Sequence, residues 1–169
     1  TLTRVEGLDE LAAIALKADP EGSQKVARIR ELTDKGMAGE LTFSESLTQR
    51  LALLNANKSH VDILVDFLKE NVSESFLRNR AFLSEYAENI LIISSGFKDF
   101  ILPVAEYLGL KPENVYANTF VYNAQGDIIG VDTENPLSRT GGKIEVVKFL
   151  NLNGHVSVIG DGFTDYEIR

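Results

Sequence analysis

The 169-residue sequence has no cysteine and only two histidines, His60 and His155. Without cysteine the chain forms no disulfide, no zinc–thiolate site and no cysteine nucleophile. Two histidines that lie far apart in the sequence also argue against a histidine-rich metal site. The longest strongly apolar run, Ile90 to Ile93, is too short to cross a bilayer, so no segment is predicted to span a membrane.

The charge balance is acidic, with 25 aspartates and glutamates against 17 lysines and arginines and a formal net charge of −8. This excess argues against nucleic acid or an anionic membrane surface as a general partner. Apolar residues make up 44% of the chain, which is typical of a soluble domain with a real core and excludes a disordered chain. No signal-type apolar region follows Thr1, so we expect a cytoplasmic location; the oligomeric state stays open.

The first 72 residues show helical periodicity throughout. Apolar side chains recur three and four residues apart in four stretches, near residues 8–15, 26–32, 43–54 and 61–68. Gly36, Gly39 and Asn57 separate these stretches, and no strand-like alternation interrupts them. The pattern predicts a small helical bundle over residues 5–72.

From residue 73 onward, short apolar segments alternate with helical patterns. Strands are predicted at 90–93, 115–117 and 156–159, a hairpin at 120–129, and helices at 76–87, 97–108 and 144–150. This alternation indicates right-handed crossovers and a mostly parallel sheet whose apolar strands are covered by helices on both faces. The sequence therefore predicts an α/β core domain over residues 73–169 plus 1–4.

Ligands of open α/β sheets bind beyond the carboxyl ends of strands, and polar residues gather at two such ends here. Ser94 follows an apolar strand, and its hydroxyl with the N–H groups of Ser95 and Gly96 could surround a phosphate. A plain helix N-cap is the better explanation of Ser94 taken alone. Asp161 follows the last apolar segment, with Asp165 four residues later. These carboxylates could hold a hard cation such as Mg²⁺, although a turn and a helix cap explain them about equally well.

Lys143 follows two glycines at the start of a predicted helix. The surrounding residues lack the glycine and hydroxyl of a phosphate-binding P-loop. A lysine at a helix N-terminus opposes the helix dipole, which favours a role as counter-charge to an anion over simple solvation. Glu6 and Arg50 lie in the helical half, where solvated charges are the default explanation.

Several short segments, in order along essentially the whole chain, resemble parts of the phosphoserine phosphatase family within the haloacid dehalogenase superfamily. The similar segments are 1–11 just after the family's first motif, Met37-Ala38-Gly39 with Phe43 and 47–54 in its helical cap, 93–97 at the second motif, 115–118 before the hairpin, 141–143 at the third and 159–165 at the fourth. The resemblance implies a haloacid dehalogenase-like Rossmannoid sheet with a helical-bundle cap.

The resemblance also implies a Mg²⁺-dependent hydrolase that releases phosphate from O-phospho-L-serine, in serine biosynthesis, through an aspartyl-phosphate. The resemblance implies that Asp161 and Asp165 bind the metal. It implies that Ser94 binds the phosphate and Lys143 neutralises it, beside Ser95 and Gly96. Glu6 would recognise the substrate's ammonium, Arg50 its carboxylate, and Met37 and Phe43 would close over the site with apolar side chains.

The sequence departs from the family at its first motif. The Asp-x-Asp motif that carries the nucleophile would stand immediately before Thr1, so we expect residues 1–169 alone not to hydrolyse phosphoserine. The family also continues beyond the position of Arg169, and Ser95 stands where it usually has glycine. Two alternatives follow: a phosphatase of another small metabolite, or a non-catalytic domain that binds phosphate or an amino acid.

Overall fold

The first part of the chain is helical, as predicted. The computed structural model describes residues 2–160, 162–166 and 168. Its first four helices are α1 (Gly7–Ala15), α2 (Gly22–Met37), α3 (Phe43–Leu54) and α4 (Lys58–Glu70). Local side chains define where two of them begin, because a capping residue satisfies N–H groups that have no partner inside the helix. Thr42 and Glu45 form a capping box at α3, and Asn57 and His60 form another at α4.

The second part alternates helices and strands. Its helices are α5 (Glu74–Arg78), α6 (Arg80–Glu85), α7 (Lys98–Tyr107), α8 (Gly142–Leu150) and α9 (Phe163–Tyr166), with single 3-10 turns at Ala87–Asn89, Pro112–Asn114 and Pro136–Ser138. Its strands are β1 (Ile92–Phe97), β2 (Val115–Asn118), β3 (Phe120–Tyr122) and β4 (Ile128–Val131). The single helix predicted over 76–87 is therefore two short helices that meet at Asn79.

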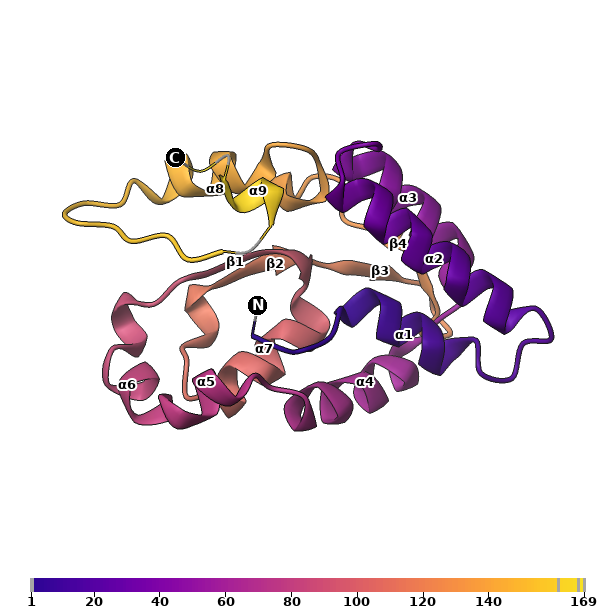
Figure 1. Cartoon of the computed structure of the whole chain (residues 1–169), viewed down its shortest axis with the longest axis horizontal. Coiled ribbons are helices and arrows are strands. Elements are labelled where there is room, and N and C mark those ends of the chain that lie inside the picture. The colour runs from indigo at the N-terminus through magenta and orange to yellow at the C-terminus, as the bar shows by residue number, and fades with distance from the viewer. Residues whose placement is uncertain (1, 161, 167, 169) are drawn as a thin grey trace.

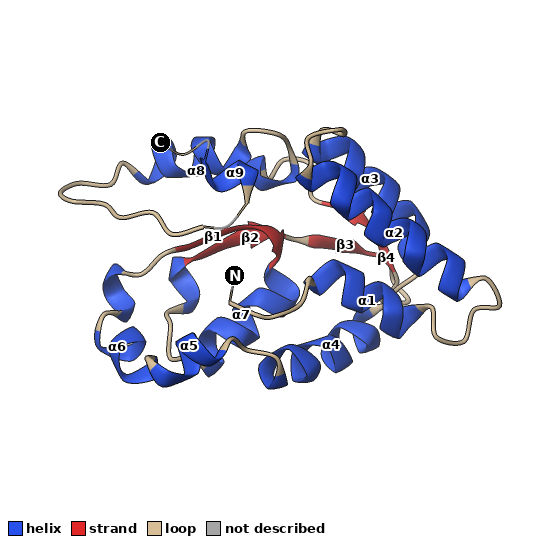
Figure 2. Ribbon diagram, viewed as in Figure 1, coloured by secondary structure: helices blue, strands red, loops and turns tan. Residues whose placement is uncertain are grey.

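The described strands form two pairs. β1 and β2 are parallel, with Ile92 opposite Val115, and α7 makes the crossover between them. β3 and β4 form the predicted antiparallel hairpin, with Phe120 opposite Val131. Figure 1 shows the strands as a central layer, with α2, α3 and α8 on one side and α1, α4 and α7 on the other. The secondary-structure colouring of Figure 2 shows the same layers. Helices thus flank both faces of the strands, as the apolar strand sequences predicted.

The prediction of a buried strand at residues 156–159 is wrong. These residues have no strand structure, and Val156, Val158 and Ile159 are 48%, 56% and 96% exposed. A strand is stable only where a neighbour accepts and donates its backbone hydrogen bonds. The described residues provide no such neighbour for this segment, so its apolar sequence alone does not form a strand.

One hydrophobic cluster joins the helices to the strands. Leu11, Ile29 and Leu64 of the helical part are fully buried in the same cluster as Phe97 and Val104. Each such side chain contributes about 1.5–3 kcal/mol relative to leaving it exposed. Burial of this kind ties α1 and α4 to α7, against which α4 packs.

Two neighbouring chain segments connect the helical part to the rest. The N–H of Arg4 donates to the carbonyl of Asn71 at 2.9 Å, and the N–H of Ser73 donates to that of Leu2 at 2.9 Å. The segments 2–4 and 71–73 therefore lie side by side, near the boundary that we predict between residues 72 and 73. The division into a cap over 5–72 and a core over 73–169 plus 1–4 stays a prediction. In the part of the chain that the structure describes, no helix combines the length and apolar character needed to cross a membrane.

Candidate active site

The polar segment Ser94–Gly96 lies inside β1, not beyond the end of its strand as predicted. β1 continues to Phe97, α7 begins at Lys98, and the pairing with β2 is irregular between Ile93 and Phe97. Within this irregular stretch the N–H of Gly96 donates to the Ser94 hydroxyl oxygen at 3.1 Å. A hydroxyl that accepts one hydrogen bond still has its own O–H to donate. Ser94 therefore keeps a donor that suits an anionic ligand.

Asn118, at the end of β2, connects β1 with the segment before α8. Its side chain is fully buried, and its amide nitrogen donates to the carbonyls of Ser95 and Leu137, at 2.9 Å each. Its side-chain oxygen has no hydrogen-bond partner among the described residues. The two donated bonds fix the position of the Ser95 backbone relative to the turn that precedes Lys143.

The two glycines before Lys143 are required by the backbone. Gly141 has a φ of 78°, in the left-handed region that favours glycine. A Cβ added to Gly142 would lie 1.8 Å from the carbonyl oxygen of Pro136, so only glycine allows this approach. The start of α8 consequently packs directly on the 3-10 turn Pro136–Ser138. This contact fixes the position of the Lys143 backbone.

Lys143 and Asp165 meet across 22 residues of sequence. The Lys143 ammonium lies 2.5 Å from the Asp165 carboxylate, and the two side chains are only 12% and 20% exposed. The other oxygen of Asp165 accepts the N–H of Gly162 at 3.0 Å. A charged pair that water reaches poorly interacts more strongly than a surface pair. The expected second carboxylate, Asp161, lies outside the described residues.

Three of the predicted residues meet at one narrow cleft. Phe43 of α3, Ser95 of β1 and Lys143 of α8 line it together with the turn 139–142. Its volume is about 10 Å³, no more than one water molecule needs. Met37 is not among the lining residues, and it is 61% exposed at the end of α2. The structure therefore brings Phe43 against the strand and the lysine and leaves Met37 on the surface.

Arg50 is buried, contrary to the solvated charge that a helical residue has by default. It is 8% exposed, and this burial lowers the pKa of its guanidinium, while the charges of Asp9 and Glu6 act in the opposite direction. An arginine remains charged even so. Glu6 itself is exposed just before α1. The structure thus places the two predicted readers of an amino acid within electrostatic reach of each other.

The expected metal ligands can be compared with what Mg²⁺ requires. Among the residues that the structure describes, no group of three or more His, Cys, Asp or Glu side chains forms a metal cluster. Asp165 supplies carboxylate oxygens, the hard ligands that Mg²⁺ prefers. Its donor chemistry fits the ion, while in this structure its oxygens contact Lys143 and Gly162.

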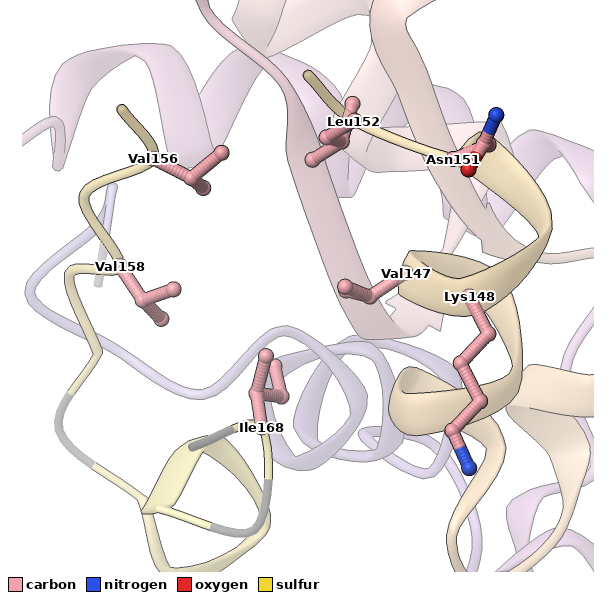
Figure 3. Close-up of a pocket in the computed structure, with 7 residues that line it drawn as sticks. All are labelled: Val147, Lys148, Asn151, Leu152, Val156, Val158 and Ile168. Atoms are coloured by element: carbon pink, nitrogen blue, oxygen red, sulfur yellow. The ribbon is translucent and has the colours of Figure 1, made fainter. Parts of the chain in front are cut away.

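A much larger hollow lies elsewhere, along the second half of α8. Figure 3 shows apolar side chains of Val147, Val156, Val158 and Ile168 pointing into this space of about 570 Å³. Lys148, Asn151 and Leu152 complete its lining. Its walls are mostly apolar, whereas a phosphate needs convergent donors, so we place the candidate site at the cleft beside Lys143.

Sequence reasoning missed three buried polar residues, Asp9, Thr33 and Asn118. Thr33 falls four residues after the buried Ile29, so helical periodicity places its hydroxyl on the apolar face of α2. A polar residue at a core position is the signal that could have indicated a role. For Asn118 the signal was its place at the end of a predicted strand.

Similarity to known proteins extends along nearly the whole chain. No family model matches. The chain is 34% identical over 167 residues to the chloroplastic phosphoserine phosphatase of Arabidopsis thaliana, covering 97% of this chain and 54% of that protein. It is 33% identical over 170 residues to the phosphoserine phosphatase of Mus musculus, covering 99% of this chain and 72% of that protein. The chain thus spans about half of the plant relative and a larger share of the mouse relative.

A solved structure agrees with these relatives. The crystal structure of a phosphoserine phosphohydrolase-like protein from Francisella tularensis superimposes with a TM-score of 0.85 at 26% identity, covering 99% of this chain and 77% of that one. This likeness confirms the predicted α/β, haloacid dehalogenase-like fold class. Identity above 30% along nearly all of the chain, with a matching fold, shows that the chain belongs to the phosphoserine phosphatase family.

Proposed function

We propose that the protein containing this chain is a phosphomonoesterase that releases inorganic phosphate from O-phospho-L-serine. The observation that carries the proposal is the cleft where Phe43, Ser95 and Lys143 come together from three distant parts of the sequence. The names of the relatives support the same reaction, since those proteins are phosphoserine phosphatases. The product would be L-serine, which fits a role in serine biosynthesis; a cytoplasmic location stays a prediction.

The side chains at the cleft suit a phosphoryl group, and the cleft, which has the size of about one water molecule in this structure, would have to widen to admit it. The Lys143 ammonium would neutralise phosphate charge, and because it is only 12% exposed, water would screen that attraction weakly. The Ser94 hydroxyl would donate to a phosphate oxygen. An aspartate from the motif that the resemblance puts ahead of Thr1 would attack phosphorus while the second aspartate of that motif protonates the leaving serine oxygen, so that L-serine departs. The second aspartate would then take a proton from the water that cleaves the aspartyl-phosphate. Phosphoryl transfer depends mainly on such positioning and charge stabilisation.

Asp161 and Asp165 would hold Mg²⁺ at this site. The bound ion would supply positive charge beside the phosphate oxygens. Within the chain itself, Asp165 also orients Lys143 through their ion pair.

Recognition of the amino acid would fall to the helical part. Glu6 would pair with the ammonium of phosphoserine, and the Arg50 guanidinium would bind its carboxylate with the two-pronged geometry that arginine favours. Phe43 would exclude water from the phosphate. Met37, which is exposed at the end of α2, would have to move towards the cleft to share in this closure.

The test compares two phosphate esters in the Arg50→Ala variant of the protein with its first motif present. We expect the KM for O-phospho-L-serine to rise roughly tenfold or more, because a charge-assisted hydrogen bond contributes about 1.5–3 kcal/mol. The KM for p-nitrophenyl phosphate, which has no amino acid group, should stay nearly unchanged. Arg78→Ala, at an exposed arginine of α5, is the matched control.

Equal effects of Arg50→Ala on both esters would remove the claim of amino acid specificity. Calorimetric titration separates the alternatives. A non-catalytic binding domain would bind O-phospho-L-serine without releasing phosphate even when the residues ahead of Thr1 are present. Residues 1–169 alone should bind it without turnover, and hydrolysis by this fragment would contradict the placement of the nucleophile.

A further inference from the structure

A buried polar chain links three helices beside Arg50. The hydroxyl of Thr33, on α2, donates to the Asp9 carboxylate of α1 at 2.7 Å, an acceptor that is charged and closer than the Ile29 carbonyl oxygen at 3.1 Å. The same hydroxyl oxygen accepts an N–H from the Nη1 nitrogen of Arg50, on α3, at 3.1 Å. All three residues are at most 8% exposed. A hydroxyl that donates to a carboxylate becomes a better acceptor, so each bond strengthens the other.

From this chain the geometry points to Asp9 and Thr33 as positioning residues that set specificity for a substrate carboxylate. The inference rests on the proposed function, because it assumes that Arg50 binds the carboxylate of phosphoserine. Asp9 and Thr33 would not touch the substrate. They would act through Arg50 by holding its guanidinium at a fixed angle and by compensating its charge.

The positive charge of Arg50 depends on Asp9. A buried guanidinium is costly unless a partner compensates it. Desolvation is the main influence on Arg50 and lowers its pKa, and the charge of Asp9 is the largest influence that opposes this. Asp9 therefore keeps a cation tolerable in a place that would otherwise reject it. A neutral residue at position 9 would leave Arg50 with less compensation.

The hydrogen bond with Thr33 concerns the orientation of the Arg50 guanidinium. A guanidinium binds a carboxylate through two parallel N–H groups on one edge. Thr33 engages Nη1, which lies outside the edge of the guanidinium formed by Nε and Nη2. The Nε of Arg50 is buried and has no hydrogen-bond partner among the described residues. A charged donor without an acceptor is unfavourable, and a substrate carboxylate on that edge would remove the penalty.

The test uses two substrates that differ in one group. O-phosphoethanolamine is O-phospho-L-serine without its carboxylate. We expect Thr33→Val, in the protein with its first motif present, to lower the ratio of kcat/KM for phosphoserine over phosphoethanolamine roughly tenfold, about the size of one lost orienting hydrogen bond. The loss should come from the KM for phosphoserine, with kcat and the KM for phosphoethanolamine nearly unchanged. Asp9→Asn should act in the same direction.

Conservative and distant variants serve as controls. Thr33→Ser keeps the hydroxyl and should retain the wild-type ratio. Thr48→Val and Asp34→Asn make the same chemical changes at exposed positions of α3 and α2 and should have no effect. An equal loss for both substrates in Thr33→Val, or an unchanged ratio, would mean that Thr33 only supports the fold and would overturn the inference.

A measurement on the wild-type protein covers the case in which the variants do not fold. The Nε–H signal of Arg50 is followed in a nitrogen-15 NMR spectrum of unsubstituted residues 1–169, which should bind without turnover, and is assigned with Arg50→Lys. It should shift on titration with O-phospho-L-serine and not with O-phosphoethanolamine. No difference between the two titrations would overturn the inference. A wild-type enzyme with equal kcat/KM for both substrates would overturn the proposed function and this inference with it. A wild-type preference that Thr33→Val leaves intact would overturn the inference alone.

Discussion

Replacing Asn118 by alanine tests whether this residue holds the candidate site together. The substitution removes both hydrogen bonds from the buried amide nitrogen and leaves the carbonyls of Ser95 and Leu137 without that donor. A buried polar group that loses its partner costs about 1–3 kcal/mol. Loss of the Asn118 side-chain oxygen, which has no partner among the described residues, offsets part of this cost. We therefore expect a net destabilisation of about 2–4 kcal/mol.

Urea denaturation followed by circular dichroism measures this free energy of unfolding. Asn79→Ala is the matched control, because the Asn79 side chain also donates to a backbone carbonyl, that of Ser75, but is exposed. The control should lose less than about 1 kcal/mol, since water replaces an exposed hydrogen bond. A variant Asn118→Asp should be at least as damaging as Asn118→Ala, because it puts a carboxylate oxygen against two carbonyls. Equal stability of Asn118→Ala and Asn79→Ala would refute the reasoning.

Two further predictions concern a backbone contact and a surface charge. Gly142→Ala should destabilise the fold by about 1–3 kcal/mol in urea denaturation, because the new Cβ would meet the Pro136 carbonyl oxygen. The control Gly130→Ala should cost less than about 0.5 kcal/mol, because no atom lies near its added Cβ. Glu31 should titrate by NMR with a pKa of about 2, because Lys35 lies 2.6 Å from its carboxylate and the hydrogen bond between them lowers the pKa from 4.5. The stabilisation of the fold by the ionised Glu31 should be complete above pH 4.5 and disappear as the pH falls through 2. A titration midpoint of Glu31 near pH 4.5 would contradict this prediction, and Lys35→Met should raise that midpoint.

The sequence predicted those elements whose stability is local. The four N-terminal helices follow from apolar residues spaced three and four apart, and the capping side chain of Thr42 marks where α3 begins. The parallel pair β1 and β2 and the hairpin β3–β4 follow from short apolar segments with turn residues between them. The segment 156–159 has an equally apolar sequence and is not a strand, because pairing depends on a neighbour that the segment itself cannot provide.

Part of the site was also readable from the sequence. The sequence predicts Ser95 just after a strand and Lys143 at the start of a helix; Ser95 lies inside β1 instead, and both residues line the cleft with Phe43. The roles of these residues, and of Glu6 and Arg50, remain predictions. The pairing of Lys143 with Asp165 was not predicted, because it joins residues far apart in the chain.

The sequence alone determined most of the order of helices and strands and the family resemblance, because periodicity, caps and short motifs act between residues close together in the chain. Only the tertiary structure decided that Arg50 is buried and that Thr33 stands between it and Asp9. The physical reason is that burial and hydrogen-bond partners come from other helices. Arg50, which the sequence alone would place in solvent, is therefore held by residues of α1 and α2.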